Sequence, residues 1–288
     1  LAPLPVASNG LSTAVLDGKI FVIGLYGSTS MEIYDPNTQT WSTSTPIPDG
    51  TSQASAIAWD GKILLIGGNV QGSLSSRVLE FDPTTSIWTP RASMPSRRGG
   101  PELVIFEGRV WAIGGVDFRG SYLDDVESYD PITDSWRVEA SLTVARNWPS
   151  SWVANGKVFT AGGVRHGIFF FSVECYDTIT NSWSSVSDLP ENKYASNSAI
   201  VNGQIFLVAG QKGNNSYSKK VYAADVSPPM DLYYREANAS GSIALSNLDA
   251  DLTARLDGVH AGTIPEGLVS AVDHSLSAPS GYGILERT

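Results

Sequence analysis

Basic and aromatic residues occur together at several points of this sequence, between stretches that are otherwise apolar. The candidates for ligand binding are Arg97, Arg98, Arg119, Tyr122, Arg146, Trp148, Arg165, Lys193 and Tyr194. A guanidinium group binds a carboxylate through two parallel hydrogen bonds, and an aromatic ring stacks on apolar or sugar surfaces. The residue types therefore favour a ligand with negative charge, such as an acidic peptide, an acidic glycan or a sugar acid.

Residues that could carry catalysis are fewer. Asp117, Glu102 and Arg146 are the groups available for acid–base work. The sequence has three histidines and a single cysteine, Cys175, and we find no zinc pattern, complete calcium loop, Gly-x-Ser-x-Gly motif or phosphate-binding loop. We therefore predict no metal site and no cofactor, and a structural role for Cys175.

A repeat determines where these residues must lie. Four tryptophans are spaced by 47, 48 and 47 residues, and each follows an aspartate by six positions. The pairs are Asp35 with Trp41, Asp82 with Trp88, Asp130 with Trp136, and Asp177 with Trp183. A fixed period of this length indicates an array of similar structural units.

Turn residues divide each unit into short strands. Two-residue turns stand between apolar runs at Asp17-Gly18, Asp60-Gly61, Glu107-Gly108, Asn155-Gly156 and Asn202-Gly203. Because such turns need positive φ at both positions, they predict five antiparallel hairpins. Glycines, usually paired as in Gly67-Gly68, end the second strand of each hairpin, where the backbone must approach closely.

The order of hairpin, double glycine, aromatic-Asp-Pro and tryptophan resembles the kelch repeat over about residues 4–226. The resemblance implies an all-β fold, a kelch-type β-propeller with five recognisable four-stranded blades, six being the alternative. It implies that the tryptophans and the aromatic residues before each aspartate pack between neighbouring blades. We predict a propeller over residues 1–228 and an extension of strand, short helices and strand over residues 229–288.

The resemblance also implies a site. In kelch propellers, the loops from second to third strand and from fourth to first strand share one face, which would gather the candidates. Kelch-like adaptors bind acidic peptides through arginines in similar loops, and Arg97, Arg98 and Arg146 match these by position alone. Kelch-like copper oxidases need a cysteine-linked tyrosine and two histidines on the metal. Two of the three histidines here, His260 and His274, lie in the tail and Cys175 lies on an expected third strand, so we do not expect that site. Kelch-like sialic acid mutarotases suggest the alternative, a sugar-acid enzyme of the mutarotase or lyase type that uses Asp117, Glu102 and Arg146.

The amino-acid composition restricts which binding partners and which cellular locations we expect. The net charge is −10 and only 17% of residues are charged, so a phosphate backbone would be repelled and nucleic acid is not expected. No apolar run approaches the roughly 20 residues of a transmembrane helix. Few lysines and many small polar residues favour a secreted or cell-surface protein, in which Asn214 and Asn238 would be glycosylation candidates.

The two ends of the sequence suggest assembly. Residues 1–5 match the proline-containing exits of the fourth strands, so we predict that they complete part of the last blade. Residues 241–256 resemble linker or stalk segments of bacterial surface and fibre proteins. An open sheet edge could take a strand from the tail or from a second copy. We therefore predict a non-catalytic extracellular binding or assembly module of a larger surface or fibrous protein, self-associating through its termini and able to bind carbohydrate.

Overall fold

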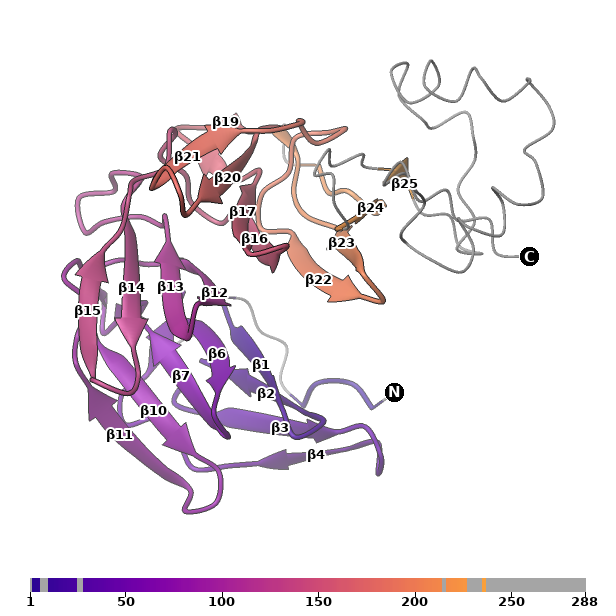
Figure 1. Ribbon diagram of the computed structural model, residues 1–288. Helices are drawn as coiled ribbons and strands as arrows, with labels where there is room; N and C mark the ends of the chain where they lie inside the picture. Colours follow the sequence, from indigo (N-terminus) through magenta and orange to yellow (C-terminus); the bar gives the residue numbers. More distant parts are fainter. Residues whose placement is uncertain (1, 6–9, 25–27, 214–215, 227–234, 237–288) are drawn as a thin grey trace. The chain divides into compact units, whose positions relative to one another are not determined.

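The computed structural model describes residues 2–5, 10–24, 28–213, 216–226 and 235–236 (Figure 1). These residues form β-strands and connecting turns, without an α-helix in the described ranges. The chain divides into two units, residues 1–148 and residues 149–288, and each unit is described on its own. The predicted boundary between residues 228 and 229 stays a prediction, because residues 227–234 lie outside the described ranges.

The first unit contains three four-stranded antiparallel sheets, each a meander of neighbouring strands (Figure 1). The first sheet consists of β1 (Ser12–Leu16), β2 (Lys19–Ile23), β3 (Met31–Asp35) and β4 (Thr40–Thr43). The second consists of β6 (Ser55–Trp59), β7 (Lys62–Ile66), β10 (Val78–Asp82) and β11 (Ile87–Arg91). The third consists of β12 (Glu102–Phe106), β13 (Arg109–Ile113), β14 (Val126–Asp130) and β15 (Ser135–Val138). A small sheet of β5 (Thr51–Ser52), β8 (Asn69–Val70) and β9 (Ser73–Leu74) joins two loops.

The second unit repeats the same arrangement in two further sheets. The fourth sheet consists of β16 (Ser150–Ala154), β17 (Lys157–Ala161), β20 (Val173–Asp177) and β21 (Ser182–Ser185). The fifth consists of β22 (Asn197–Val201), β23 (Gln204–Val208), β24 (Val221–Asp225) and β25 (Arg235–Glu236). A loop hairpin pairs β18 (Val164–Arg165) with β19 (Ile168–Phe169).

The predicted turns and ring pairs are confirmed. Both residues of all five two-residue turns have positive φ, for example 45° at Asp60 and 72° at Gly61. In the four repeats with a tryptophan, the aromatic residue before the aspartate contacts that tryptophan across the third and fourth strands, with ring centroids 4.9–5.5 Å apart. The aspartate turns the chain between these strands, as at Asp82, whose Oδ1 accepts the Thr84 N–H at 2.8 Å.

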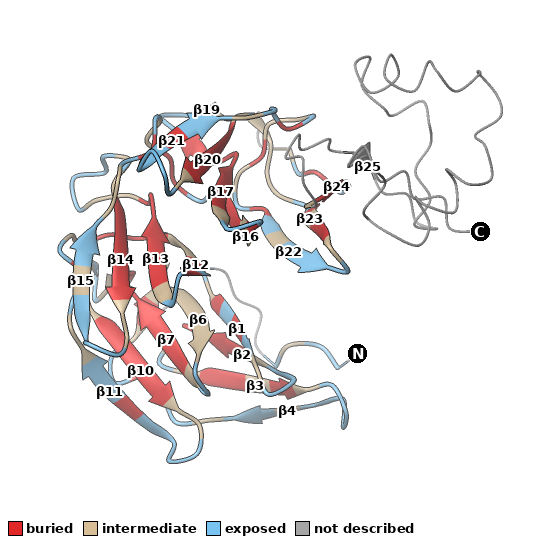
Figure 2. Ribbon diagram, in the orientation of Figure 1, coloured by how far each residue is buried: buried red, intermediate tan, exposed pale blue. Residues whose placement is uncertain are grey.

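Packing between neighbouring sheets supplies the core. Phe21 of β2 and Phe81 of β10 belong to one buried cluster, which joins the first sheet to the second. Figure 2 shows buried second and third strands, whereas much of β4, β11 and β15 is exposed. The Trp88 and Trp136 indoles reach the preceding sheet, donating to the Thr45 oxygen at 3.3 Å and the Ala92 oxygen at 2.8 Å. The predicted inter-blade packing of the tryptophans is thus confirmed within this unit.

The double glycines are explained by one close contact. In three repeats, the second glycine of the pair donates its N–H to the backbone carbonyl of a loop residue. That loop residue follows the tryptophan of the same repeat by ten positions. The pairs are Gly68 with Arg98, Gly115 with Arg146, and Gly163 with Lys193. The first glycine of the pair has φ near +65° and lies against the same carbonyl. A side chain at that glycine would occupy the space of the loop backbone.

The predictions for the chain ends have mixed outcomes. Trp41 Nε1 donates to the Ala2 oxygen at 3.1 Å, as Trp88 does to Thr45, so the N-terminal segment does take the position of a fourth-strand exit. Residues 235–236 supply a strand that pairs with β24. That the N-terminal segment completes part of the last blade stays a prediction. A strand was predicted over residues 230–236, of which only 235–236 are described, and the predicted tail helices lie outside the described residues.

Candidate functional site

Three of the nine candidate binding residues are buried. The Arg98, Arg146 and Lys193 side chains have no exposed surface, which contradicts the expectation that they face a ligand. Each follows the tryptophan of its repeat by ten positions, at the loop whose carbonyl receives the double glycine. They therefore belong to the repeated scaffold, and their period, equal to that of the tryptophans, was the signal that could have revealed this from the sequence.

Arg98 illustrates the scaffold role. One guanidinium nitrogen, Nη1, donates to the carbonyls of Gly114 and Asp125, both at 3.0 Å. The Nη2 nitrogen lies 3.0 Å from Glu127 Oε1, and this carboxylate is itself buried. Arg98 thus ties the exit of the second sheet to the third sheet through a buried ion pair and two backbone carbonyls.

Lys193 is a buried cation that makes similar contacts in the second unit. Its Nζ donates to the Lys220 oxygen at 3.2 Å, lies 4.6 Å above the Tyr222 ring centre and is 3.7 Å from Glu191. Burial lowers the pKa of the Lys193 ammonium, while the Glu191 carboxylate acts in the opposite direction. These contacts hold β24 against the loop that precedes β22.

The remaining candidates are accessible. Arg97 and Arg119 are exposed in the first unit, Trp148 is 36% exposed, and Tyr122 is half-buried beside Val116. In the second unit, Arg165 is exposed, and the half-buried Tyr194 packs its ring 5.0 Å from Phe169. The loop arrangement expected of a propeller face is confirmed locally, because three fourth-to-first loops pair with second-to-third loops: Ser52 with Asn69, Gly99 with Val116, and Tyr194 with Gln211.

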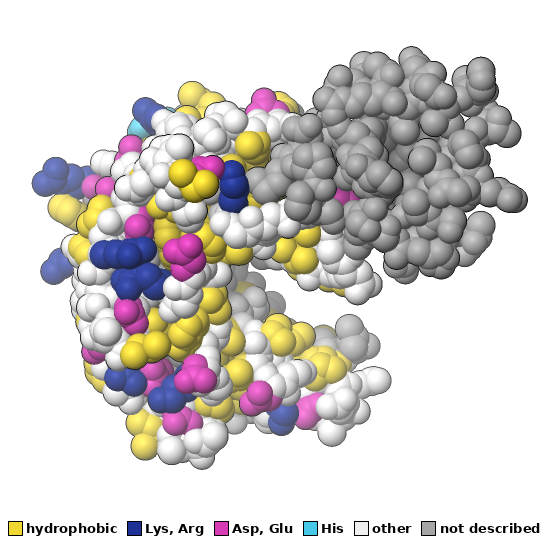
Figure 3. Space-filling model, viewed as in Figure 1, with side chains coloured by type: hydrophobic (Ala, Val, Ile, Leu, Met, Phe, Trp, Pro, Cys, Tyr) yellow, Lys and Arg dark blue, Asp and Glu magenta, His cyan; other side chains and the backbone are white. Residues whose placement is uncertain are grey.

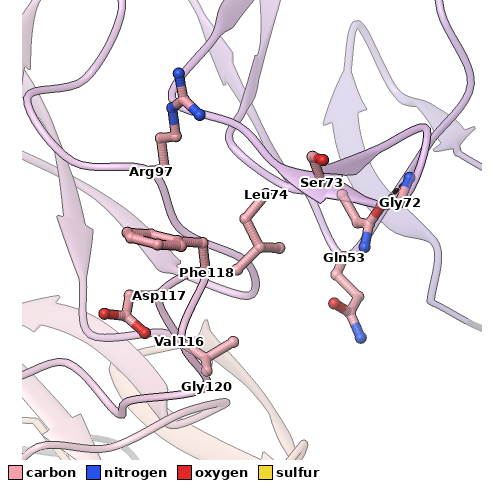
Figure 4. Close-up of a pocket in the computed structure, with 10 residues that line it drawn as sticks. Gln53, Gly72, Ser73, Leu74, Arg97, Val116, Asp117, Phe118 and Gly120 are labelled. Carbon is pink, nitrogen blue, oxygen red and sulfur yellow. Dashed lines mark hydrogen bonds between the residues drawn. The ribbon is translucent and has the colours of Figure 1, made fainter.

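A groove of about 490 Å³ lies on this loop surface of the first unit. Its lining comes from the β8–β9 hairpin, the loop after β13 and two connections between sheets (Figure 4). The lining residues are Gln53, Asn69, Gly72, Ser73, Leu74, Arg97, Val116, Asp117, Phe118 and Gly120. The structure thus brings one predicted residue, Arg97, to the groove, and adds an apolar surface from Leu74, Val116 and Phe118.

Gly99 lies directly beside two of the lining residues. A Cβ on Gly99 would lie 2.8 Å from Leu74 Cδ2 and 3.4 Å from Gln53 Oε1, so a side chain at this position would displace Leu74. In the second unit, the residue at the same repeat position is Tyr194, and its ring contacts Phe169, which corresponds to Leu74. Leu74, Tyr122 and Phe169 each precede the tryptophan of their repeat by 14 positions, a pattern by which sequence reasoning could have found them.

The chemistry of the groove is apolar with a cation at its margin. The Phe118 side chain is 65% exposed, and the Arg119 guanidinium lies 5.1 Å from its ring centre. The exposed Arg97 side chain has no hydrogen bond or ion pair to other described residues. Asp117 instead serves its own loop, since Oδ1 accepts the N–H groups of Arg119 at 2.9 Å and Ser121 at 2.7 Å. An apolar side chain next to a carboxylate would fit this arrangement.

The groups proposed for the enzyme alternative occupy three different settings. Arg146 is buried, Asp117 stabilises a turn, and Glu102 lies on β12. Among the described residues, no group of three or more His, Cys, Asp and Glu side chains is arranged to hold a metal. Figure 3 shows acidic and basic side chains interspersed over the outer strands of the first unit. The glycosylation candidates Asn214 and Asn238 lie outside the described residues.

Cys175 is buried on β20, and burial raises the pKa of its thiol to about 11. Because the thiolate is the reactive form, we expect negligible reaction with a disulfide reagent at pH 8 in the folded protein, and complete reaction in guanidinium chloride. Absorbance of the released thiol measures both rates. Rapid reaction in the folded state would contradict the burial of Cys175.

Within the described residues, no helix has the length and apolar character needed to cross a bilayer.

Comparisons with known proteins agree with this architecture. Residues 2–163, more than half of the chain, match the family described as KLHDC2/KLHL20/DRC7 Kelch-repeats domain, and residues 151–190 match the Kelch motif. Kelch-like protein 35 from Homo sapiens is 34% identical over 67 residues, which are 22% of this chain and only 12% of that protein. The solved structure titled "Structure of YjhT" aligns with a TM-score of 0.74 at 16% identity, covering 83% of this chain and 86% of that chain.

The likeness to YjhT shows the fold alone, since the identity is low. The family match covers the repeats that hold the double glycines, the ring pairs and the groove. These observations together show that the chain belongs to the Kelch-repeat family and has the kelch-type β-propeller fold.

Proposed function

We propose that this protein is a non-catalytic binding module whose groove takes a peptide segment of a partner protein. The peptide carries one apolar anchor side chain and an acidic residue close to it. The fold supports a protein-binding role, because kelch-repeat domains mediate protein binding. The observation that carries the finer proposal is the groove itself, in which the exposed Phe118 and the half-buried Leu74 lie beside the exposed Arg97 (Figure 4).

Each side of the groove would contact a different part of the peptide, the apolar anchor on one side and the acidic residue on the other. The groove volume of about 490 Å³ is in the range of sites that bury small ligands, roughly 300–1,000 Å³. An apolar anchor over Leu74 and Phe118 would remove exposed apolar surface from water. Arg97 would then meet a carboxylate. This attraction is local to the groove, because the net charge of the whole protein is −10.

Selection from a phage-displayed peptide library tests this proposal. We expect wild-type protein to enrich peptides with an acidic residue near an aromatic or aliphatic one, at a Kd on the order of 1–100 μM. Phe118→Ala and Arg97→Ala should each weaken binding about tenfold, roughly 1.4 kcal/mol. Isothermal titration of the best synthetic peptide against each variant measures the change.

Matched variants keep the test specific. Ile132→Ala removes an 86% exposed apolar side chain at a turn outside the groove, and Lys219→Ala removes an exposed cation outside it. Both should bind the peptide as wild type does. Selection of peptides without acidic residues, or equal binding by Phe118→Ala and Ile132→Ala, would contradict the proposal.

Gly99→Tyr introduces the residue type that the second unit has at the same repeat position, where Tyr194 packs on Phe169. The substitution is designed to close the groove. We expect loss of most peptide binding, because the new ring would fill the space beside Leu74. The fold should survive, since Gly99 has no positive φ and the atom nearest its added Cβ is the flexible end of Leu74. Far-ultraviolet circular dichroism and thermal melting provide the folding control, and unaltered peptide affinity would show that ligand binds elsewhere.

We further propose, on sequence grounds, that the module is secreted or cell-surface, serves a larger surface or fibrous protein, and self-associates through its termini. Its low lysine content and many small polar residues support the location. Light scattering over a range of protein concentrations tests self-association, which a strictly monomeric protein would contradict. The sugar-acid enzyme alternative gains no support from Arg146, whose side chain is buried.

A further inference from the structure

The β8–β9 hairpin presents an unpaired backbone edge at the groove. Its two-residue turn, Gln71-Gly72, has φ of 52° and 86°, so Val70 and Ser73 form the hydrogen-bonded pair that closes the hairpin. Hydrogen-bonded and non-hydrogen-bonded pairs alternate along an antiparallel ladder. The Ser75 N–H donates to the Gly68 oxygen at 2.8 Å, two positions further along, which confirms the alternation.

Leu74 is therefore in the non-hydrogen-bonded position opposite Asn69. Its N–H and C=O point away from β8, and among the described residues neither group has a hydrogen-bond partner. β8 is the central strand of the small sheet, because it pairs with β5 on one side and with β9 on the other. β9 is thus one of the two edge strands of this three-stranded sheet, and it is the one that lines the groove.

The groove lies along this edge. Gly72 has no side chain, so its backbone forms part of the groove wall, and Ser73 and Leu74 continue the same wall (Figure 4). The opposite wall comes from the loop that holds Val116, Asp117 and Phe118. An extended peptide could lie between these walls, because successive side chains of a strand alternate between two faces.

We infer that the partner peptide binds by strand addition to β9, with its backbone pairing with the N–H and C=O of Leu74. Main-chain hydrogen bonds hold the peptide, while alternate side chains reach Phe118 and Arg97 and decide which sequence is preferred. This inference rests on the proposed function, and it deepens that function by assigning the binding mode and an extended conformation of the ligand.

Amide hydrogen exchange followed by NMR tests the inference, with the best synthetic peptide from the library selection as the probe. In the free protein, the Leu74 amide should exchange at least tenfold faster than the Ser75 amide, which has a protein partner. With saturating peptide, the Leu74 amide should slow at least tenfold. A peptide that binds while Leu74 still exchanges freely would overturn strand addition and leave the proposed function intact. Failure of every library peptide to bind would overturn both.

Backbone-modified peptides and protein variants provide a second measurement. N-methylation at each position of the peptide in turn should weaken binding at least tenfold at alternate residues, and little at the residues between them. Leu74→Pro should weaken binding at least tenfold more than Leu74→Ala, because both lose the leucine side chain but only proline lacks the N–H. Proline is tolerated on edge strands, and thermal melting of both variants checks the fold. Equal binding by the two variants, or N-methyl effects without alternation, would overturn the inference.

Discussion

Gly114→Ala is expected to destabilise the protein by about 3 kcal/mol or more, the largest effect of any single methyl group that we predict. Gly114 has φ of 62°, and a Cβ there would lie 2.5 Å from the Arg146 carbonyl oxygen. That contact involves backbone, which cannot move without displacing the loop that carries Arg146 and the hydrogen bond from Gly115. Urea unfolding monitored by tryptophan fluorescence measures the loss.

Gly108→Ala separates the two causes of this effect. Gly108 has nearly the same φ, 71°, but nothing lies within 4 Å of the position that its Cβ would take. The variant should lose only the conformational part, roughly 1–2 kcal/mol. Equal destabilisation by Gly114→Ala and Gly108→Ala would show that the contact between the double glycine and the loop is unimportant.

Arg98→Ala is expected to cost about 3–5 kcal/mol, because it leaves the Glu127 carboxylate buried without its cation. Glu127 Oε1 has its ion pair with Arg98 at 3.0 Å, and its other oxygen has no hydrogen-bond partner among the described residues. The carbonyls of Gly114 and Asp125 would lose a donor as well. Urea unfolding again provides the measurement.

Two variants act as controls for this prediction. Lys19→Ala breaks an ion pair with Asp35 in which the two side chains are 48% and 24% exposed, so its cost should be below about 1 kcal/mol. Removal of both buried charges, in Arg98→Met with Glu127→Leu, should recover much of the stability that Arg98→Ala loses. A loss for Arg98→Ala as small as that for Lys19→Ala would mean that Arg98 is not a scaffold residue.

These predictions separate the basic residues into two classes with different consequences. Substitution of Arg98 should lower stability at any ligand concentration, whereas substitution of Arg97, its neighbour in sequence, should lower peptide affinity and leave unfolding unchanged. The difference arises because one side chain is fully buried and the other is exposed at the groove.

The sequence by itself determined the fold. Local rules apply where a residue type suits one backbone conformation, so Asp60-Gly61 and its equivalents predicted the hairpins, and the spacing of Trp88 and Trp136 predicted the repeating sheets. The resemblance to the kelch repeat also implied that two sets of loops share one face, and the structure pairs Gly99 with Val116 between two such loops. Each of these features depends on residues near each other in sequence or on their period.

Only the tertiary structure decided which loop residues face a ligand. Arg97 and Arg98 are adjacent in the sequence and carry the same side chain. Only Arg98 is buried, where it contacts the Glu127 carboxylate and two backbone carbonyls at the next sheet. The groove likewise depends on contacts between loops, since Leu74, Arg97 and Phe118 line it together although they are distant in sequence. Burial and cavity shape arise from contacts between segments distant in sequence, and residue type alone does not specify them.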